Sequence, residues 1–335
     1  MHMPMSVIRK KIFWKSVVPV IMGNMGRKVP FEVTHQINFA CNLRCKYCGL
    51  PEIKTKELNT LQVKDAMEEF ANAGTSVWNF TGGEPLLRTD LGELVRFSKH
   101  VGIDAVNINT NGMLYKYRKD GLNLADKILV SIDGPKEIHE EMRGYGSYDK
   151  VVEAINLIKA DGVEISLISV LSEANMRNNF EGLKFMFDFA REKDVRISFN
   201  VIYTHDFNKH FIDKYKTGVE QTIEALKMIL EFDKNTGLLD RTSSLYEETI
   251  KKLKGEETKI KSFAGILYCR LMPNGLVVPC IFNCNEGVDG LKHGFLNAFR
   301  MLSNNHVCNS TFSYHNDQDL RYMIDMKSVM KVLAK

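Results

Sequence analysis

Short apolar runs alternate with amphipathic stretches from Phe31 to about residue 205. Six of these runs have the length and composition of buried strands: Val33–Phe39, Val77–Thr81, Asp104–Asn109, Lys127–Ile132, Glu164–Val170 and Val195–Val201. Between them, Leu61–Ala73 and Tyr148–Ala160 carry apolar residues at helical spacing, and Gly74, Gly102 and Gly162 stand where such helices should end. The repeated strand–helix pattern predicts an α/β domain with a parallel sheet, whose carboxyl strand ends carry the functional site.

The pattern changes after this domain. Helical periodicity over Glu220–Phe232 and Tyr246–Leu253 is followed by a segment rich in Cys, Gly, Asn and Pro, which suggests a small module held by something other than a hydrophobic core. We predict five parts, namely a basic extension at 1–30, the α/β domain at 31–205, a helical linker at 206–265, a cysteine-rich module at 266–310 and a helical tail at 311–335.

The N-terminal segment is apolar and basic. Residues 5–30 contain six basic side chains and no acidic one, together with Trp14 and spaced apolar residues. A basic amphipathic segment with a tryptophan is typical of a helix that lies on a membrane surface. The alternative is a helix that caps the open end of the sheet and leaves its lysines in solvent.

Composition narrows the class of protein. The 335 residues are 44% hydrophobic and 26% charged, as in a globular protein, and the net charge of +4 gives no case for nucleic-acid binding. No continuous apolar run reaches the length of a spanning helix, and the first residues lack a secretory signal pattern. We therefore expect a cytoplasmic protein, with peripheral membrane contact if the N-terminal segment meets lipid.

Three of the seven cysteines follow the first predicted strand. Phe39–Gly49 places Cys41, Cys45 and Cys48 in a C-x3-C-x2-C pattern. In a reducing cytosol such clustering is typical of metal ligands rather than disulfides. Thiolates ligate iron–sulfur clusters, and three of them on a four-iron cube leave one iron open. The alternative is a zinc knuckle or a set of buried cysteines.

Glycine-rich and polar segments follow the next three strands. They are Thr81-Gly-Gly-Glu-Pro85, Asn109-Thr-Asn-Gly112 and Ser131-Ile-Asp-Gly-Pro135, with Arg143 further on. Glycines let the backbone approach a ligand, Glu84 can accept hydrogen bonds from an ammonium group, and an arginine can bind a carboxylate through two hydrogen bonds. Ordinary turns and a solvated arginine are the alternatives.

Together, the cysteine pattern with Tyr47 before its third cysteine, the GGEP stretch and the S-x-D-G-P…R run resemble the radical S-adenosylmethionine (SAM) superfamily over about 33–201. The resemblance implies a partial (β/α)6 TIM-like barrel and a SAM-binding [4Fe–4S] cluster on Cys41, Cys45 and Cys48. It also implies a set of SAM contacts: Tyr47 beside the adenine, Gly82, Gly83, Glu84 and Pro85 at the amino group, Ser131 and Asp133 near the ribose, Arg143 near the carboxylate, Asn200 at the adenine or ribose, and Asn109 and Asn111 at the end of the third strand. For Asn200, a satisfied polar group inside the barrel is an equal alternative.

Four further cysteines lie in the C-terminal module: Cys269, Cys280, Cys284 and Cys308. The residues between the first two predict a β-hairpin that turns at Pro273–Gly275 and returns along Leu276–Val278. The spacing resembles the twitch and SPASM extensions of the superfamily, which implies an auxiliary [4Fe–4S] cluster. The spacing after Cys280 departs from that pattern, so Cys308 is the weakest assignment and His306 could replace it. A structural zinc site is the rival.

The resemblance implies an enzyme that cleaves SAM to a 5′-deoxyadenosyl radical and removes hydrogen from an unactivated C–H group, as an oxidoreductase or a bond-forming transferase. A flavodoxin- or ferredoxin-type protein would supply the electron. We expect a lipid, an isoprenoid or a small metabolite as substrate; the alternatives are a maturase of ribosomally made peptides and a non-enzymatic iron–sulfur or zinc protein.

Overall fold

The computed structural model describes residues 5–202, 208, 212–256, 262–281 and 284–303. The described strands form one sheet in the order β6-β5-β4-β3-β2-β1-β7-β8-β9. Their bounds are β1 Glu32–Gln36, β2 Val77–Thr81, β3 Ala105–Thr110, β4 Lys127–Ser131, β5 Glu164–Leu171, β6 Arg196–Val201, β7 Tyr268–Leu271, β8 Leu276–Val278 and β9 Val288–Asp289.

Strands β1 to β6 pair in parallel with their sequence neighbours, which confirms the predicted α/β fold with a parallel, open sheet. The curved sheet is not closed between β6 and β9, so the architecture is a partial barrel. Every predicted strand is present; β2 has the predicted limits, and the others differ at their ends, most of all β1, which ends at Gln36 rather than Phe39.

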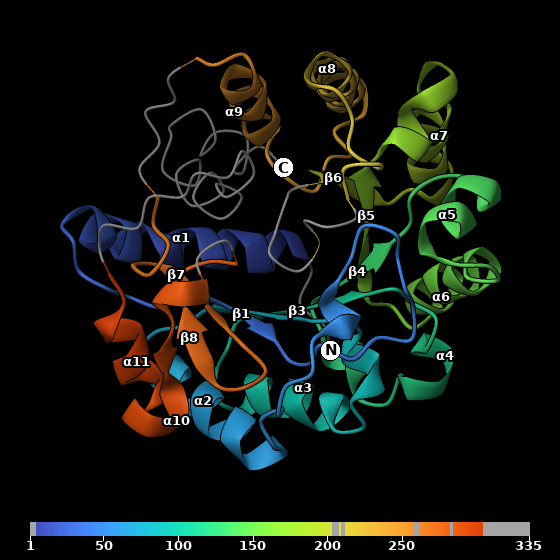
Figure 1. The fold of residues 1–335 in the computed structure, drawn as a ribbon. Helices are drawn as coiled ribbons and strands as arrows, with labels where there is room; N and C mark the ends of the chain where they lie inside the picture. The colour runs from blue at the N-terminus through green and yellow to red at the C-terminus, as the bar shows by residue number, and fades with distance from the viewer. Residues whose placement is uncertain (1–4, 203–207, 209–211, 257–261, 282–283, 304–335) are drawn as a thin grey trace.

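Helices follow the strands along the outer side of the sheet, where they form an arc (Figure 1). The α-helices are α1 Met5–Asn24, α2 Thr60–Asn72, α3 Leu91–His100, α4 Tyr115–Arg118, α5 Lys136–Arg143, α6 Tyr148–Ala160, α7 Glu173–Lys193, α8 Val219–Thr236, α9 Ser243–Leu253, α10 Gly290–His293 and α11 Phe295–Met301. Gly74 and Gly162 come just after the ends of α2 and α6 with positive φ angles of 98° and 74°, a conformation that glycine adopts without strain.

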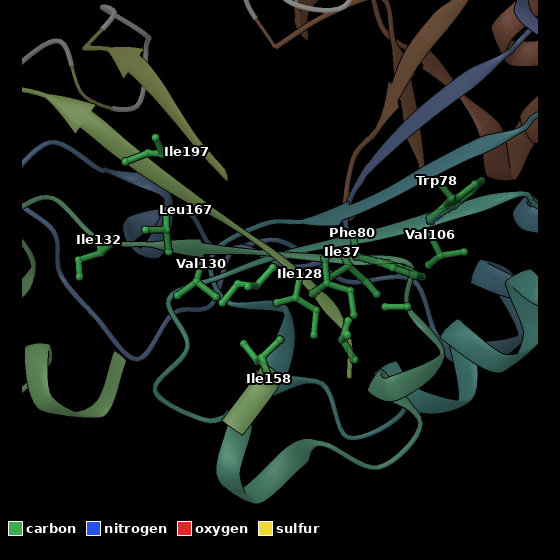
Figure 2. Packing of buried hydrophobic residues seen from close by; sticks show 14 of the residues in the cluster. Ile37, Trp78, Phe80, Val106, Ile128, Val130, Ile132, Ile158, Leu167 and Ile197 are labelled. Atoms are coloured by element: carbon green, nitrogen blue, oxygen red, sulfur yellow. The ribbon is translucent and has the colours of Figure 1, made fainter. Parts of the chain in front are cut away.

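The main hydrophobic core fills the layer between the sheet and these outer helices. Figure 2 shows Ile128 and Val130 of β4 near Ile158 of α6, all of them fully or almost fully buried. On β2, Trp78 and Phe80 belong to the same core as Phe70 of α2, and the Trp78 and Phe70 ring centroids are 6.1 Å apart. This layer leaves alternate strand residues free to face the barrel interior.

Helix α1 packs against the amino-terminal ends of the strands. Ile12 and Val20 are buried in a second apolar cluster that contains Ala105 and Tyr268, the first residues of β3 and β7. Lys11 and Lys15 each bind the Asp104 carboxylate at 2.7 Å. These contacts favour the interpretation of α1 as a helix that covers one end of the barrel. Within the described ranges, no helix combines the length and hydropathy that a membrane-spanning segment requires.

The C-terminal hairpin forms as predicted, and it extends the barrel sheet. Strand β7 pairs in parallel with β1 and antiparallel with β8, and Gly275 turns between them with φ of 88°. Side chains of the hairpin and of α11, including Leu271, Val277 and Phe299, belong to the main core. For the described residues, the expectation that this module is held by something other than a hydrophobic core is therefore wrong.

Candidate active site

The cysteine loop lies just beyond the carboxyl end of β1. Cys41, Cys45 and Cys48 are half-buried free thiols within ten residues of one another. The Cys48 backbone N–H donates to the Cys45 carbonyl at 3.0 Å, and the Arg44 guanidinium donates to the Cys41 and Leu43 carbonyls at 2.8 and 2.9 Å. These bonds fold the loop back on itself, so that its three sulfurs belong to one compact segment.

The electrostatics of the loop suit a cationic occupant. Burial raises the pKa of Cys45 to about 12, although the Arg143 charge opposes it, and burial likewise raises the pKa of Cys41 and Cys48. The neighbouring thiolates raise the Cys41 and Cys45 values further, so a positively charged metal core would relieve their mutual repulsion. Among the described residues, no three His, Cys, Asp or Glu side chains converge on a single metal ion. The thiolates of a [4Fe–4S] cluster each bind a different iron of one cube, so they do not need to converge on a single ion.

The Gly82–Gly83 segment passes very close to the chain that leads into the cysteine loop. A Cβ atom on Gly83 would lie 2.2 Å from the Ala40 carbonyl oxygen, and one on Gly82 would lie 2.4 Å from the Asn38 carbonyl oxygen. Gly83 N and Glu84 N donate to the Asn38 and Ala40 carbonyls at 2.9 and 2.8 Å. This close backbone contact therefore requires glycine at both positions, independently of any ligand that the segment binds.

Glu84 is fully buried, and its carboxylate is occupied by protein donors. One oxygen accepts from Leu86 N at 3.0 Å and Thr110 Oγ1 at 2.7 Å, and the other accepts from Asn111 N at 2.8 Å. Burial raises the pKa of Glu84, and these hydrogen bonds oppose the rise. In the structure, Glu84 thus connects the GGEP segment to the end of β3; Pro85 follows it, buried, at the start of the short 3₁₀ helix Pro85–Leu87.

Asn111 turns its side chain toward the cysteine loop. Its amide nitrogen lies 2.8 Å from Asn42 Oδ1 and 3.8 Å from the Cys41 sulfur. Its oxygen accepts from Met113 N at 3.1 Å, and the next residue, Gly112, has a positive φ of 78°. The predicted residues Glu84, Asn111 and Cys41 are therefore brought together at the carboxyl edge of the sheet.

A second buried group joins Asp133, Arg143 and Tyr47. The Asp133 carboxylate accepts from Arg143 Nε at 2.6 Å, from Arg143 Nη2 at 3.2 Å, from the Tyr47 hydroxyl at 2.9 Å and from Val170 N at 2.9 Å. Burial alone would raise the pKa of Asp133, but the charge and hydrogen bonds of Arg143 hold it below its usual value. The structure thus shows Asp133 joined to Tyr47, Arg143 and Val170, and its contact with the SAM ribose stays a prediction.

Asn109, Ser131 and Asn200 lie near the carboxyl ends of β3, β4 and β6 and are all partly exposed. In the described part of the chain, the Asn200 side-chain oxygen is buried without a hydrogen-bond partner. Such an acceptor suits a donor on a bound ligand.

Sequence reasoning missed two residues that bind Glu84. The Asn38 side chain donates to the Glu84 carbonyl, and the Thr110 hydroxyl donates to the Glu84 carboxylate. The only sequence signal for them was their position, Asn38 just before the cysteine loop and Thr110 inside the Asn109–Gly112 segment.

Two of the four predicted auxiliary ligands can be placed. The Cys269 thiol is buried in the main core, and Cys280 lies in the cluster around α1. Burial raises the pKa of Cys269 above its usual range. The Cys284 side chain and all of Cys308 lie outside the described residues, so the auxiliary cluster remains a prediction.

Comparison with known proteins decides the family. A model of the radical SAM superfamily matches residues 36–178. The chain is also 33% identical over 281 residues to the AdoMet-dependent heme synthase of Oleidesulfovibrio alaskensis, a match that covers 76% of this chain and 69% of the relative. The chain belongs to the radical SAM superfamily. This radical SAM protein is 29% identical over 248 residues to the Fe-coproporphyrin III synthase of Methanosarcina barkeri, covering 70% of this chain and 54% of that relative's length.

Solved structures show the same fold. SuiB of Streptococcus suis, solved bound to S-adenosylmethionine, superposes with a TM-score of 0.65 over 83% of this chain and 67% of its own, at 15% identity. At this identity the likeness concerns the fold alone. It agrees with the partial barrel described above. In this radical SAM chain, the cysteine loop follows the carboxyl end of β1.

Proposed function

We propose that this radical SAM enzyme reductively cleaves SAM and uses the 5′-deoxyadenosyl radical to remove hydrogen from an organic substrate. The observation that carries the proposal is the loop of Cys41, Cys45 and Cys48, held between the Glu84–Asn111 contacts and the Asp133–Arg143 pair. Each of these groups comes from the carboxyl end of a different strand, which is where barrel enzymes carry their sites.

The three thiolates would hold a [4Fe–4S] cluster, and SAM would bind its open iron. When bound, that cluster would supply the one electron needed for reductive cleavage of the SAM C5′–S bond. The residues of the chain bind and orient these groups. The Gly82–Gly83 backbone borders the site, the Asn200 side-chain oxygen has no hydrogen-bond partner among the described residues, and Arg143 supplies positive charge beside the cysteines.

A small polar metabolite is the substrate class that we favour. The inner face of the barrel carries Glu32, Asn79 and Asn107, and their side chains form a hydrogen-bonded chain with N–O distances of 2.7 and 2.8 Å. Such a lining suits a polar substrate better than a lipid. The similarity to enzymes named for haem and for Fe-coproporphyrin III covers 76% and 70% of the chain, which makes a haem precursor the first compound to test.

A ribosomally made peptide is the second candidate. SuiB has also been solved bound to the precursor peptide SuiA, and that structure covers 94% of this chain with a TM-score of 0.62. That likeness concerns the fold, so the peptide stays behind the metabolite. Under either substrate, an auxiliary [4Fe–4S] cluster on Cys269, Cys280, Cys284 and Cys308 would accept an electron or bind substrate, and a flavodoxin- or ferredoxin-type protein would reduce the enzyme.

Anaerobic iron and sulfide analysis, combined with 5′-deoxyadenosine release under a strong reductant, tests the proposal. We expect about eight irons in the unmodified protein and about four in the Cys41→Ala, Cys45→Ala, Cys48→Ala triple variant, with deoxyadenosine release lost. A loaded protein that never releases deoxyadenosine, with or without Fe-coproporphyrin III, would contradict the radical mechanism. Zinc bound to the C-terminal cysteines would rule out the auxiliary iron–sulfur cluster. If Fe-coproporphyrin III does not stimulate deoxyadenosine release, that compound would be ruled out as the substrate.

A further inference from the structure

The turn that ends β3 touches the cysteine loop directly, through Asn111, Asn42 and Cys41. Cys41 Sγ accepts from Leu43 N at 3.4 Å and lies 3.8 Å from the Asn111 amide nitrogen. Sulfur hydrogen bonds are longer than those to oxygen, and hydrogen bonds to ligand sulfurs are one of the factors that set iron–sulfur reduction potentials. Asn111 is therefore placed to act on the cluster itself.

The orientation of the Asn111 amide is fixed by its neighbours. Met113 N donates to the Asn111 oxygen, and a backbone N–H needs an acceptor, so the amide nitrogen must face the other way. On that side it meets Asn42 Oδ1 and the Cys41 sulfur. Asn111 is only 8% exposed, so water has little access to compete for either contact. The donor therefore points toward sulfur because of the turn's own geometry.

Glu84 holds that turn in place. Its carboxylate accepts from Asn111 N and Thr110 Oγ1, and Thr110 Oγ1 in turn accepts from Gly112 N at 3.0 Å. The same residue's backbone is bonded to Asn38 and Ala40, just before Cys41. A single buried side chain thus fixes the relative position of the sulfur and its donor.

We propose that Asn111 is a positioning residue that donates a hydrogen bond to the Cys41 sulfur and raises the reduction potential of the cluster, and that Glu84 holds Asn111 in that position. Reduction adds negative charge to the cluster and its sulfurs, and a donor at Cys41 stabilises this added charge. This inference rests on the [4Fe–4S] site proposed above, but it assigns Asn111 to the cluster rather than to SAM.

The test is a potentiometric reduction of the reconstituted cluster, followed by electron paramagnetic resonance without SAM. Asn111→Leu removes the donor at similar size, and Asn111→Asp replaces it with a carboxylate. We expect a more negative potential in both, with the larger shift in Asn111→Asp. Glu84→Gln leaves one of its donors without an acceptor and should shift the potential in the same direction by less. Asn107→Leu is the matched control, because Asn107 lies earlier in β3 and its side chain, among the described residues, bonds only Asn79.

The outcomes separate this inference from the proposed function. An unmodified protein that assembles no cluster would refute the proposed function, whereas loaded Asn111 variants with unchanged potentials would overturn the inference alone. Loss of iron from both Asn111 variants, with normal loading of Asn107→Leu, would also overturn it, because Asn111 would then be needed for assembly. A shift as large in Asn107→Leu would show that the effect is not specific to the sulfur contact.

Discussion

The carboxylates of Glu84 and Asp133 show how differently two acidic residues of one site can be used. Glu84 accepts from three neutral donors, whereas Asp133 is paired with a buried arginine. Breaking a buried ion pair from one side leaves the other charge without compensation, which costs more than the loss of an exposed pair. We therefore expect a substitution that breaks the Asp133–Arg143 pair to lower the free energy of unfolding more than one that breaks an exposed ion pair.

Asp133→Asn should lower the free energy of unfolding of the iron-free protein at pH 7 by about 3–5 kcal/mol, because Arg143 then stays buried without its counter-charge. The matched control is Glu141→Gln in α5, the helix that ends at Arg143, since Glu141 is partly exposed and pairs with Arg177 at 2.6 Å. It should cost less than about 1 kcal/mol. Urea unfolding followed by circular dichroism measures both, and equal losses would contradict the buried-pair argument.

The contribution of Asp133 to the free energy of unfolding should also depend on pH. The pKa of Asp133 is lowered in the folded protein, so its stabilising effect is present above the usual pKa near 4 and is lost as the pH falls through the lower folded value. The difference between the unmodified protein and Asp133→Asn should therefore be constant from pH 7 to about 5 and shrink below about 4. A difference that grows toward acid pH would have the wrong sign.

At the scale of elements, hydrophobic periodicity was sufficient to predict the six parallel strands, because each one has a buried apolar core. It could not predict where the motifs touch, since the Gly83 contact with Ala40 joins two loops. It also missed the break inside α7, where Asn178, Asn179 and Phe180 have positive φ angles of 50°, 58° and 62°. Phenylalanine rarely adopts that conformation, so the sequence gives no signal at Phe180, whereas the two asparagines before it are of a type that adopts positive φ more often.

Gly83→Ala tests the contact between the GGEP segment and the cysteine loop. Its new methyl group would overlap backbone atoms, which cannot move aside as a flexible side chain can. We expect a loss of about 2–3 kcal/mol in unfolding free energy and reduced iron content. Gly218→Ala is the control, because it precedes α8 with open space around it and a φ of −62°, and it should cost under about 1 kcal/mol. Similar losses in both variants would argue against the contact.

At the scale of the whole molecule, helix α1 and the C-terminal hairpin are packed onto the barrel. Sequence alone left open whether the N-terminal helix meets lipid or protein, because its apolar residues occur around the helix. Val20 is 1% exposed and Val18 is 61% exposed, so one face docks and another does not. Only the folded barrel determines which face is buried.

Val20→Ala should lower the free energy of unfolding by about 2 kcal/mol, whereas Val18→Ala should change it by less than about 0.5 kcal/mol. The two substitutions remove the same atoms from one helix and differ only in burial. Thermal or urea unfolding of the iron-free protein measures them. Equal and small effects would mean that α1 is not docked on the strand ends in solution.

Strand β1, which leads directly into the cysteine loop, has β2 on one side and β7 on the other. Its register with β7 pairs Glu32 with Tyr268, a residue far along the chain. Strand β7 therefore leaves the ribosome on the order of ten seconds or more after β2. Until then β1 is an open edge, and open edges invite pairing with other chains. The strand that leads into the cysteine loop is therefore completed on its second side only after the C-terminal hairpin has emerged and closed that edge.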